Sequence, residues 1–231
     1  METLLLAGGK GERLGAAAAG RPKPLVLVAG RPLAAWSVER LARAGVGRVV
    51  VACAAGREEE FTRELSGLGA EIVAVGEPEP LGRGGGLRLA AAQRTEGGPV
   101  YALNGDELVD LDFADLLERH RRSEVAATIA VARPRSPFGL VELDEHDVVT
   151  GFREGGTLPV WVSCGVYVLG EEALARLPER GDHERTTFPE LAAERRLGAF
   201  RHEGLWLTVN TAKELRVADE HLRVQPGALS A

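Results

Sequence analysis

The hydrophobic positions in the first half of the chain form short β-branched or apolar runs that alternate with amphipathic stretches. Four of these runs are predicted strands, at Thr3–Ala7, Arg48–Cys53, Glu71–Val75 and Pro99–Leu103. The stretches between them follow the period of a helix at Leu33–Ala44, Glu58–Leu68 and Leu87–Gln93. Strands that alternate with helices indicate a mostly parallel sheet covered on both faces, in which ligands gather at the carboxyl ends of the strands.

The pattern changes after Asp112, where strands follow one another with little helix between them. These strands are predicted at Val125–Ala132, Gly139–Leu143, Val148–Phe152 and Trp161–Leu169, and helices near Glu171–Leu177, Phe188–Arg196 and Ala212–Leu222. No repeat and no clear linker divides the chain. We therefore expect an α/β fold in one domain over residues 1–231, with a parallel half over about 1–122 and a strand-rich half over about 123–231.

Composition excludes several classes of partner. The chain has 28 basic and 34 acidic residues, a net charge of −6, and no basic block, so nucleic acid is a poor candidate ligand. No apolar run approaches the length of a membrane span, and the N-terminus lacks the core of a signal peptide. Cys53 and Cys164 lie in apolar runs without a CxxC pair, which indicates buried, reduced thiols. A soluble cytoplasmic protein is expected.

Lysine is rare in this chain and is concentrated near the N-terminus. Three lysines occur against 25 arginines, and two of them, Lys10 and Lys23, lie within one short stretch. Lysine offers a compact point charge that fits against a phosphate in a narrow space. The stretch begins as a strand and breaks into glycines whose backbone N–H groups can face an anion, while Pro22 and Pro24 fix the backbone around Lys23.

Two common phosphate-binding motifs do not fit this stretch. The P-loop pattern fails because neither serine nor threonine follows Lys10, and the dinucleotide pattern GxGxxG fails because the third glycine is one residue late. The second predicted strand also lacks the terminal acidic residue that would hold a ribose. A plain tight turn remains open, but it leaves Arg13 and the Pro-Lys-Pro segment unexplained.

The segment from Leu6 to Leu14, followed by Pro22-Lys23-Pro24-Leu25, resembles the GxGxR and PK signature of the nucleotidyltransferase superfamily. That superfamily includes sugar-1-phosphate nucleotidyltransferases and MobA-like enzymes. The resemblance implies a three-layer, Rossmann-like fold of the GT-A-like nucleotide-diphospho-sugar transferase type, with an NTP-binding half followed by an acceptor-binding half. It also implies that Arg13 steadies the departing pyrophosphate and that Lys23 neutralises charge at the α-phosphorus. The implied nucleotide-binding residues are Leu6, Ala7, Gly8, Gly9, Lys10, Gly11, Gly82 and Asn104.

A divalent cation, Mg²⁺, is expected because the reaction brings two anions together. Asp106 matches the family's Gly-Asp and follows a predicted strand, and the resemblance assigns a second ligand to Asn210. Two alternatives stay open. Asp110 and Asp112 form a DxD of the kind that glycosyltransferases use, although Asp112 also fits a helix N-cap. Asn210 or Thr211 equally fits the N-cap of the last helix, with a capping box completed by Glu214.

The acceptor side is implied by two further stretches. Residues 139–154 resemble the strand pair that ends in the family's Glu-Lys, with Glu154 in the glutamate position and Gly155 in place of the lysine. Gly165 matches the glycine of an Asn-Ala-Gly-Ile-Tyr stretch, in which Ser163 replaces asparagine. The loop of residues 77–86 lies where the family reads the base, or it is only a mobile loop.

The sequence thus predicts a Mg²⁺-dependent nucleotidyltransferase. It would transfer an NMP group from an NTP to a phosphorylated acceptor, a sugar 1-phosphate or a similar metabolite, with release of pyrophosphate and no covalent protein intermediate. Two rival hypotheses are a metal-dependent glycosyltransferase that uses Asp110 and Asp112, and a non-catalytic nucleotide-binding regulator. The base, the acceptor and the oligomeric state are left open.

Overall fold

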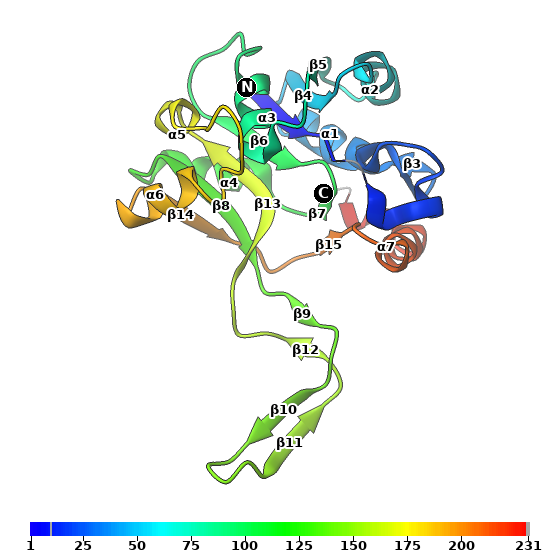
Figure 1. Ribbon diagram of the computed structural model, residues 1–231, viewed down its shortest axis with the longest axis vertical. Helices are drawn as coiled ribbons and strands as arrows, with labels where there is room; N and C mark the ends of the chain where they lie inside the picture. Colours follow the sequence, from blue (N-terminus) through cyan, green and yellow to red (C-terminus); the bar gives the residue numbers. More distant parts are fainter. Residues whose placement is uncertain (10, 230–231) are drawn as a thin grey trace.

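A seven-stranded sheet forms the centre of the molecule (Figure 1). The computed structural model describes residues 1–9 and 11–229, apart from the side chains of Glu12 and Pro226. The strand order is β14-β8-β13-β6-β1-β4-β5. The strands are β1 (Glu2–Leu6), β4 (Arg48–Ala54), β5 (Glu71–Glu77), β6 (Val100–Asn104), β8 (Ala127–Ala132), β13 (Val162–Leu169) and β14 (Leu197–Arg201). Only β13 pairs antiparallel with its neighbours in this sheet, so the predicted α/β fold with a mostly parallel sheet is confirmed.

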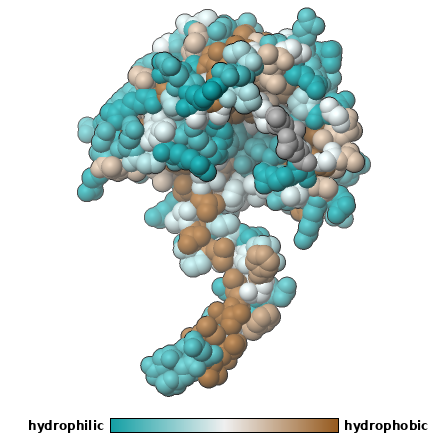
Figure 2. All heavy atoms as spheres, in the orientation of Figure 1, coloured by the Kyte–Doolittle hydropathy of each residue, from teal (hydrophilic) through white to brown (hydrophobic). Residues whose placement is uncertain are grey.

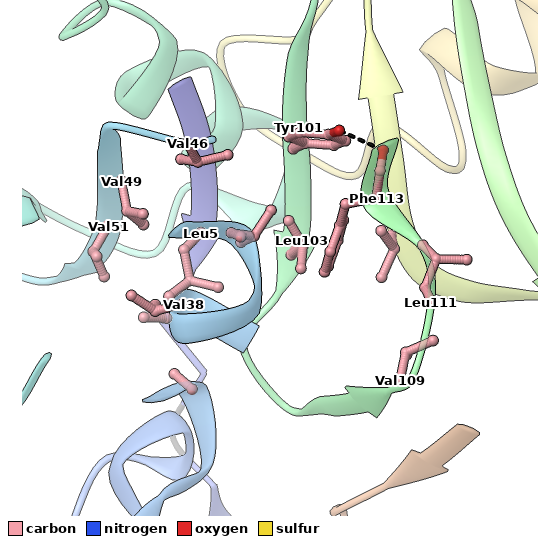
Figure 3. Packing of buried hydrophobic residues seen from close by; sticks show 14 of the residues in the cluster. Leu5, Val38, Val46, Val49, Val51, Tyr101, Leu103, Val109, Leu111 and Phe113 are labelled. Atoms are coloured by element: carbon pink, nitrogen blue, oxygen red, sulfur yellow. Dashed lines mark hydrogen bonds between the residues drawn. The ribbon is translucent and has the colours of Figure 1, made fainter. Parts of the chain in front are cut away.

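Alternation along the strands assigns residues to two separate cores. Leu5, Val49 and Val51 point to one face, where they pack with helices α1 (Leu33–Arg43), α2 (Glu58–Leu65) and α4 (Phe113–Arg121). Figure 3 shows this core, including the hydroxyl of Tyr101 that donates to the carbonyl of Phe113. The opposite face packs against helices α3 (Gly82–Ala91), α5 (Glu171–Ala175) and α6 (Thr187–Ala193). The result is a three-layer fold, because side chains of a strand alternate between its faces.

A third apolar cluster lies around the C-terminal helix. Helix α7 (Ala212–Val224) packs there with the 3-10 turn η1 (Glu12–Ala18) and the short strand β2 (Leu27–Val28), which pairs with β3 (Arg31–Pro32). Strand β15 (Trp206–Thr208) precedes α7 and pairs with β7 (Glu107–Val109), and a last 3-10 turn, η3, spans Pro226–Leu229. The β7–β15 pair links the end of β6 to the C-terminal helix. None of the helices in the described part of the chain is long and apolar enough to cross a membrane.

Residues 133–160 leave the body of the molecule as a long hairpin, which we name the arm (Figure 1). The arm contains two antiparallel pairs: β9 (Arg135–Ser136) with β12 (Gly156–Thr157), and β10 (Leu140–Leu143) with β11 (Val149–Arg153). Its tip is a tight turn in which the carboxylate of Asp144 accepts hydrogen bonds from the N–H groups of His146 and Val148. The strands β10 and β11 and the turn between them are confirmed, but no pattern in the sequence indicated that they project from the body.

Several elements differ from the pattern-based prediction. Helix α3 begins at Gly82, not at Leu87, because a run of three glycines has poor helix propensity and hides the first turns. Helix α6 ends at Ala193, and the edge strand β14 that follows was not predicted. The short pair β7 and β15 was also missed, because strands of three residues carry too little periodicity to recognise.

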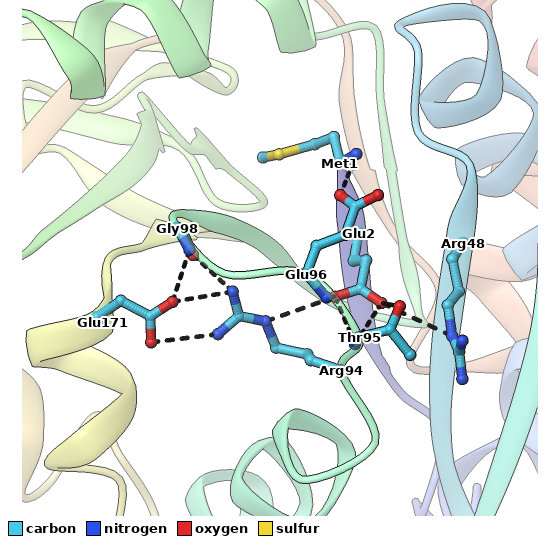
Figure 4. Close-up of polar contacts among 8 residues, drawn as sticks. All are labelled: Met1, Glu2, Arg48, Arg94, Thr95, Glu96, Gly98 and Glu171. Carbon is cyan, nitrogen blue, oxygen red and sulfur yellow. Dashed lines mark hydrogen bonds and ion pairs between the residues drawn. The ribbon is translucent and has the colours of Figure 1, made fainter.

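A buried ionic cluster closes the amino-terminal edge of the sheet, opposite the carboxyl ends (Figure 4). The carboxylate of Glu2 accepts hydrogen bonds from the backbone N–H groups of Thr95 and Glu96 and from the hydroxyl of Thr95. Arg48 and Arg94 each place Nε 3.7 Å from this carboxylate. Burial by itself raises the pKa of Glu2, but these hydrogen bonds and Arg48 outweigh it and hold the pKa below 4.5.

We expect Glu2→Ala to destabilise the protein by roughly 1–3 kcal/mol, because it leaves buried donors unsatisfied. The exposed Glu71→Ala, which removes another partner of Arg48, is the matched control and should cost little. Since the pKa of Glu2 is lower in the folded than in the unfolded chain, its contribution is present above pH 4.5 and is lost as the pH falls through the folded value. Urea unfolding of both variants at pH 7 and pH 3.5 checks this. Equal losses for the two variants at pH 7 would contradict it.

Candidate functional site

A cleft of about 560 Å³ opens at the carboxyl ends of β1 and β6, where ligands collect in parallel sheets. Several of the residues singled out from the sequence line it. The lining residues are Leu6, Gly8, Gly9, Arg13, Lys23, Pro24, Glu77, Pro80, Gly82, Arg83, Asn104, Gly105, Asp106, Glu107 and Asn210. Ala7 and Gly11 lie beside the cleft without lining it, and Lys10 falls outside the described residues.

Close approach of the backbone requires glycine at position 105, and Gly8 leaves room for the side chain of Glu77. A Cβ on Gly8 would lie 2.6 Å from Oε1 of Glu77, and one on Gly105 would lie 2.7 Å from the carbonyl oxygen of Leu6. Gly105 donates its own N–H to that carbonyl at 2.9 Å. The turns after β1 and β6 are thus locked together. The backbone of Gly8 and Gly9 borders the cleft without side chains in the way.

Lys23 lies at the centre of the polar contacts in the cleft. It begins the 3-10 turn η2 (Lys23–Leu25), with Pro22 preceding the turn and Pro24 inside it, and is 8% exposed. Its ammonium donates to the carboxylate of Asp106 and, at 2.7 Å, to Oδ1 of Asn210. Arg13 also donates to Oδ1 of Asn210, at 3.2 Å. The structure therefore brings together four residues that were selected separately from the sequence and lie up to 197 positions apart.

The local fold leaves the side chain of Asn210 free to face the cleft. The N-cap of α7 is Thr211, whose hydroxyl accepts from the N–H of Glu214 in a complete capping box. The Glu214 carboxylate in turn accepts from the backbone N–H of Asn210 at 2.7 Å. A helix cap and a side chain of Asn210 that faces the cleft are therefore compatible, since Thr211 caps the helix while the amide of Asn210 points to Lys23.

Asp110 and Asp112, the alternative DxD pair, have structural partners and do not line the cleft. Asp112 is the N-cap of α4 and accepts from the N–H of Asp115 at 3.0 Å, which confirms the capping interpretation. Asp110 lies 2.9 Å from Nε2 of the buried His202. Asp112 is thus engaged in capping α4, and both carboxylates lie outside the cleft.

Glu107 is a site residue that the sequence reasoning missed. Burial raises the pKa of Glu107 to about 8, and the neighbouring carboxylate of Asp106 adds to the effect, while the indole N–H of Trp206 donates to Glu107 at 2.9 Å. The only feature of the sequence that could have identified Glu107 is its position directly after Gly105-Asp106. A carboxyl group that is partly protonated near neutral pH lowers the negative charge beside Asp106.

The wall of the cleft at the start of α3 is built around Glu77 and Arg83. Glu77 ends β5, and its Oε2 accepts from the N–H of Leu81 at 3.1 Å. Its Oε1 lies toward Gly8 and Gly86, and no hydrogen bond to that oxygen is found among the described residues. Arg83 is held by the carboxylates of Asp182 and Glu184. Of residues 77–86, the segment from Gly82 onward is thus the first turn of a helix and not a mobile loop.

A second, larger cavity of about 940 Å³ lies on the other side of β15, between the base of the arm and the start of α7. It offers basic and aromatic side chains together, among them Arg133, Arg135, Trp161, Trp206 and Lys213. The guanidinium of Arg133 lies 4.8 Å from the ring centre of Trp161. The cavity also reaches Thr208 and Thr211, on either side of Asn210 in the chain, so the two cavities adjoin along this segment.

The two residues expected on the acceptor side lie in different places. Gly165 adopts a φ of +69° in β13, and a Cβ there would lie 2.6 Å from Nδ2 of Asn104, so it lies against the floor of the cleft. Glu154 is exposed in the arm and lines neither cavity. The structure thus brings Gly165 next to the predicted nucleotide-binding residues and does not bring Glu154 there.

The oxygen atoms around Lys23 are of the kind that a hard cation prefers. A carboxylate oxygen of Asp106 and the amide oxygen of Asn210 already converge on one positive group, the ammonium of Lys23. Magnesium takes such oxygens and completes its shell with waters and phosphate oxygens. Residues 1–9 and 11–229 hold no group of three or more His, Cys, Asp and Glu side chains arranged for a metal. Asp106 and Asn210 therefore fit a metal shared with a substrate better than a closed protein cage.

The sheet order and the cleft define an α/β protein with the nucleotide-diphospho-sugar transferase type of fold. The chain belongs to the nucleotidyl transferase family, whose family model matches residues 2–224. Among solved structures, HddC of Yersinia pseudotuberculosis aligns with a TM-score of 0.73 and 22% identity, over 96% of this chain and 99% of HddC. A putative glucose-1-phosphate thymidylyltransferase of Bacillus anthracis aligns with a TM-score of 0.77 and 16% identity, over 96% of each chain.

Curated relatives share more sequence than these structures do. The mannose-1-phosphate guanylyltransferase of Mycobacterium tuberculosis is 35% identical over 204 residues, which cover 84% of this chain and 56% of that relative. The mannose-1-phosphate guanylyltransferase catalytic subunit beta of Dictyostelium discoideum is 32% identical over 224 residues, which cover 93% of this chain and 62% of that relative. The chain thus spans 56% to 62% of the length of these two relatives.

We expect Gly165→Ala to displace Asn104 and to raise the KM for the nucleotide. Gly155→Ala is the matched control, because Gly155 has the same φ of +69° but its Cβ would meet nothing closer than 3.6 Å. Both variants pay the backbone cost of a left-handed conformation, about 1–2 kcal/mol. Only Gly165→Ala adds a contact that must move Asn104 or Glu107. Thermal melts and nucleotide titrations of the two variants measure the difference, and identical behaviour would contradict the role of Gly165.

Proposed function

We propose that this protein is a nucleotidyltransferase that moves an NMP group from an NTP to a sugar 1-phosphate and releases pyrophosphate. The observation that carries the proposal is the convergence of Lys23, Arg13, Asp106 and Asn210 in one cleft beside the glycine turn. Membership of the nucleotidyl transferase family supports it. The names of the curated relatives, which are mannose-1-phosphate guanylyltransferases, support a sugar 1-phosphate as the acceptor.

The proposed reaction is an in-line displacement at the α-phosphorus. A phosphate oxygen of the acceptor forms a new P–O bond, the bond from the α-phosphorus to the bridging oxygen breaks, and pyrophosphate leaves with the electron pair. Negative charge grows on the oxygens around the α-phosphorus and on the leaving group. In the cleft, Lys23 is held in place to neutralise the first charge and Arg13 to bind the second, so catalysis rests on positioning and electrostatics.

A magnesium ion held by Asp106 and Asn210 would supply further positive charge where phosphates of the two substrates meet. These are the two oxygens on which the Lys23 ammonium now converges. Lys23 then has to share Asp106 or turn toward the phosphate. Its four-carbon side chain allows this movement, while Pro22 and Pro24 hold its backbone.

Guanine is the base that the wall of the cleft suits best. The Watson–Crick edge of guanine presents two neighbouring donors, N1–H and N2–H₂, whereas adenine and cytosine each present an acceptor beside a donor. A carboxylate is an acceptor only. Glu77 offers such a carboxylate at the cleft wall, with Oε2 bound to Leu81 and Oε1 turned toward Gly8 and Gly86. HddC, which shares the fold, has been solved with GMP-PN.

The acceptor fits the larger cavity. A sugar 1-phosphate combines a dianion with a ring that stacks on aromatic surfaces. The cavity provides Arg133, Arg135 and Lys213 for the anion and Trp161 and Trp206 for the ring. It borders the cleft along residues 208–211, so an acceptor there can direct its phosphate toward Lys23. Arginine side chains at the base of the arm thereby replace the lysine that the family pattern has where this chain has Gly155.

Pyrophosphate release from each NTP with a panel of sugar 1-phosphates tests the function. We expect Lys23→Met to lower kcat by about 100-fold to 1,000-fold, the range for loss of one group that stabilises transition-state charge. Asp110→Ala is the control and should keep activity, because Asp110 lies outside the cleft. A metal-dependent glycosyltransferase would release no pyrophosphate from any NTP and would instead lose sugar transfer from a nucleotide sugar in Asp110→Ala. Nucleotide binding without pyrophosphate release from any pair would instead indicate a regulator.

We expect Glu77→Gln to lower kcat/KM for GTP by about 10-fold to 100-fold and to narrow the preference for GTP over ATP, since one bidentate contact to a base contributes about 1–3 kcal/mol. Glu79→Gln is the matched control, because Glu79 is exposed on the same loop and pairs with Arg180. Competition between the four NTPs in one reaction measures the ratio. An unchanged ratio in Glu77→Gln would contradict the assignment of the base.

A further inference from the structure

The arm carries most of the exposed apolar surface of the molecule. Of the ten large apolar side chains that are exposed in the described part of the chain, seven belong to residues 133–160. They are Phe138, Val141, Leu143, Val148, Val149, Phe152 and Val160. Figure 2 shows the arm standing clear of the body, with apolar residues running along much of its length. Apolar patches of this kind on soluble proteins mark interaction surfaces.

Four of these side chains lie on one face of the hairpin. Val141 pairs with Phe152 across the two strands, and Leu143 pairs with Val149. Directly paired residues point to the same face, and so do residues two apart along a strand. Val149 and Phe152 are three positions apart along β11, which would normally place them on opposite faces. The register shift between Glu142 and Leu143 brings both pairs to the same face. The face is therefore apolar over both strands, and Phe152 within it is 68% exposed.

The opposite face carries Glu142, Arg153 and Leu140, and these side chains cover its glycines. Glu142 pairs with Gly151, and a Cβ on Gly151 would lie 2.8 Å from the Glu142 carboxylate, so this side chain lies over the glycine. Leu140 and Arg153 lie over Gly156 in the same way, since a Cβ there would lie 3.2 Å from Cδ1 of Leu140 and 3.4 Å from Nε of Arg153. The hairpin is thus amphipathic: side chains cover the glycines of one face, whereas the apolar side chains of the other face are exposed to solvent. An isolated two-stranded hairpin is at best marginally stable in water, so the open face needs a cover.

Charge along the arm indicates what the cover is. The tip has three acidic residues and no lysine or arginine: Asp144, Glu145 and Asp147. The base has three arginines, Arg133, Arg135 and Arg153, against the single carboxylate of Glu154. The arm is therefore negative at its far end and positive at its near end. When two arms lie antiparallel, the acidic tip of each lies beside the basic base of the other. A two-fold axis produces this arrangement.

We propose that the partner of the arm is the arm of a second copy of this chain. Two hairpins pack their apolar faces together about a two-fold axis, so that Val141, Leu143, Val149 and Phe152 of each copy form a shared core. The acidic tip of each arm then lies beside the arginines at the base of the other. This interface is isologous and closes as a dimer. It follows from the arm alone and does not depend on the proposed chemistry of the cleft.

The other exposed apolar residues form a weaker candidate. Leu27, Val217 and Val224 lie on or beside α7, where they are interspersed with charged residues and form no paired face. Val224 is 75% exposed and therefore serves as a matched control for an arm residue. A contact through α7 would be revealed by the same experiment.

Sedimentation velocity of the full chain at concentrations up to about 100 µM tests the dimer, since an interface of this small size associates in the micromolar range. We expect the wild type to dimerise with rising concentration. The double variant Val141→Glu/Phe152→Glu should raise the dissociation constant by about 100-fold or more, because each loss counts twice in a symmetric pair. Val224→Glu should leave the dimer intact. The melting temperature should stay unchanged for both variants at low concentration, since neither site lies in the core.

Charge reversal provides the second measurement. A tip-reversed variant (Asp144→Lys, Glu145→Lys, Asp147→Lys) and a base-reversed variant (Arg135→Glu, Arg153→Glu) should each fail to dimerise, because tip and base then repel. Mixed together, the two should form a heterodimer, since each reversed end meets its opposite. A wild type that stays monomeric, a dimer that survives Val141→Glu/Phe152→Glu, or a mixture that fails to associate would each overturn the proposal. Loss of the dimer in Val224→Glu would place the interface on α7.

Discussion

The ammonium of Lys23, held between the carboxylate of Asp106 and the amide oxygen of Asn210, is the contact on which the candidate site depends. It ties the turn η2 to the end of β6 and to the segment that leads into α7, so three distant parts of the chain meet at one charge. A cation at 8% exposure requires such partners, because an unpaired buried charge is costly. The same requirement keeps the site cationic and narrow, which suits a phosphate.

Glycines that admit neighbouring groups at close range shape the rest of the cleft. Gly8 and Gly105 leave room for Glu77 and Leu6, and Gly165 leaves room for Asn104. These contacts hold the walls in fixed positions without filling the cleft with side chains. In the proposed function, the glycines and Lys23 face the phosphates, whereas Glu77 and the cavity beyond β15 face the base and the sugar.

The two ends of the sheet serve different purposes. At the amino ends of the strands, Glu2 is satisfied by Thr95, Glu96 and two arginines and has no free acceptor to offer. At the carboxyl ends, Glu77 keeps one oxygen without a hydrogen bond from the described residues, and burial raises the pKa of Glu107 to about 8. Fully paired groups stabilise a fold, while incompletely paired or perturbed groups mark a site that awaits a ligand. The arm lies apart from both ends and adds a surface for association.

The sequence by itself determined the three-layer fold, because alternation such as Leu4 against Leu5 assigns side chains to the two faces whatever their partners are. It also singled out the stretch that borders the cleft, because the glycines, Arg13 and the Pro-Lys-Pro segment are local in the chain, and it predicted the N-cap role of Asp112. Only the tertiary structure decided that Asn210 and Thr211 divide their roles and that Glu107 is perturbed. It also decided that Glu154 is exposed on the arm, away from the cleft. Burial, charge neighbours and the path of a hairpin are set by residues distant in sequence, and no local pattern records them.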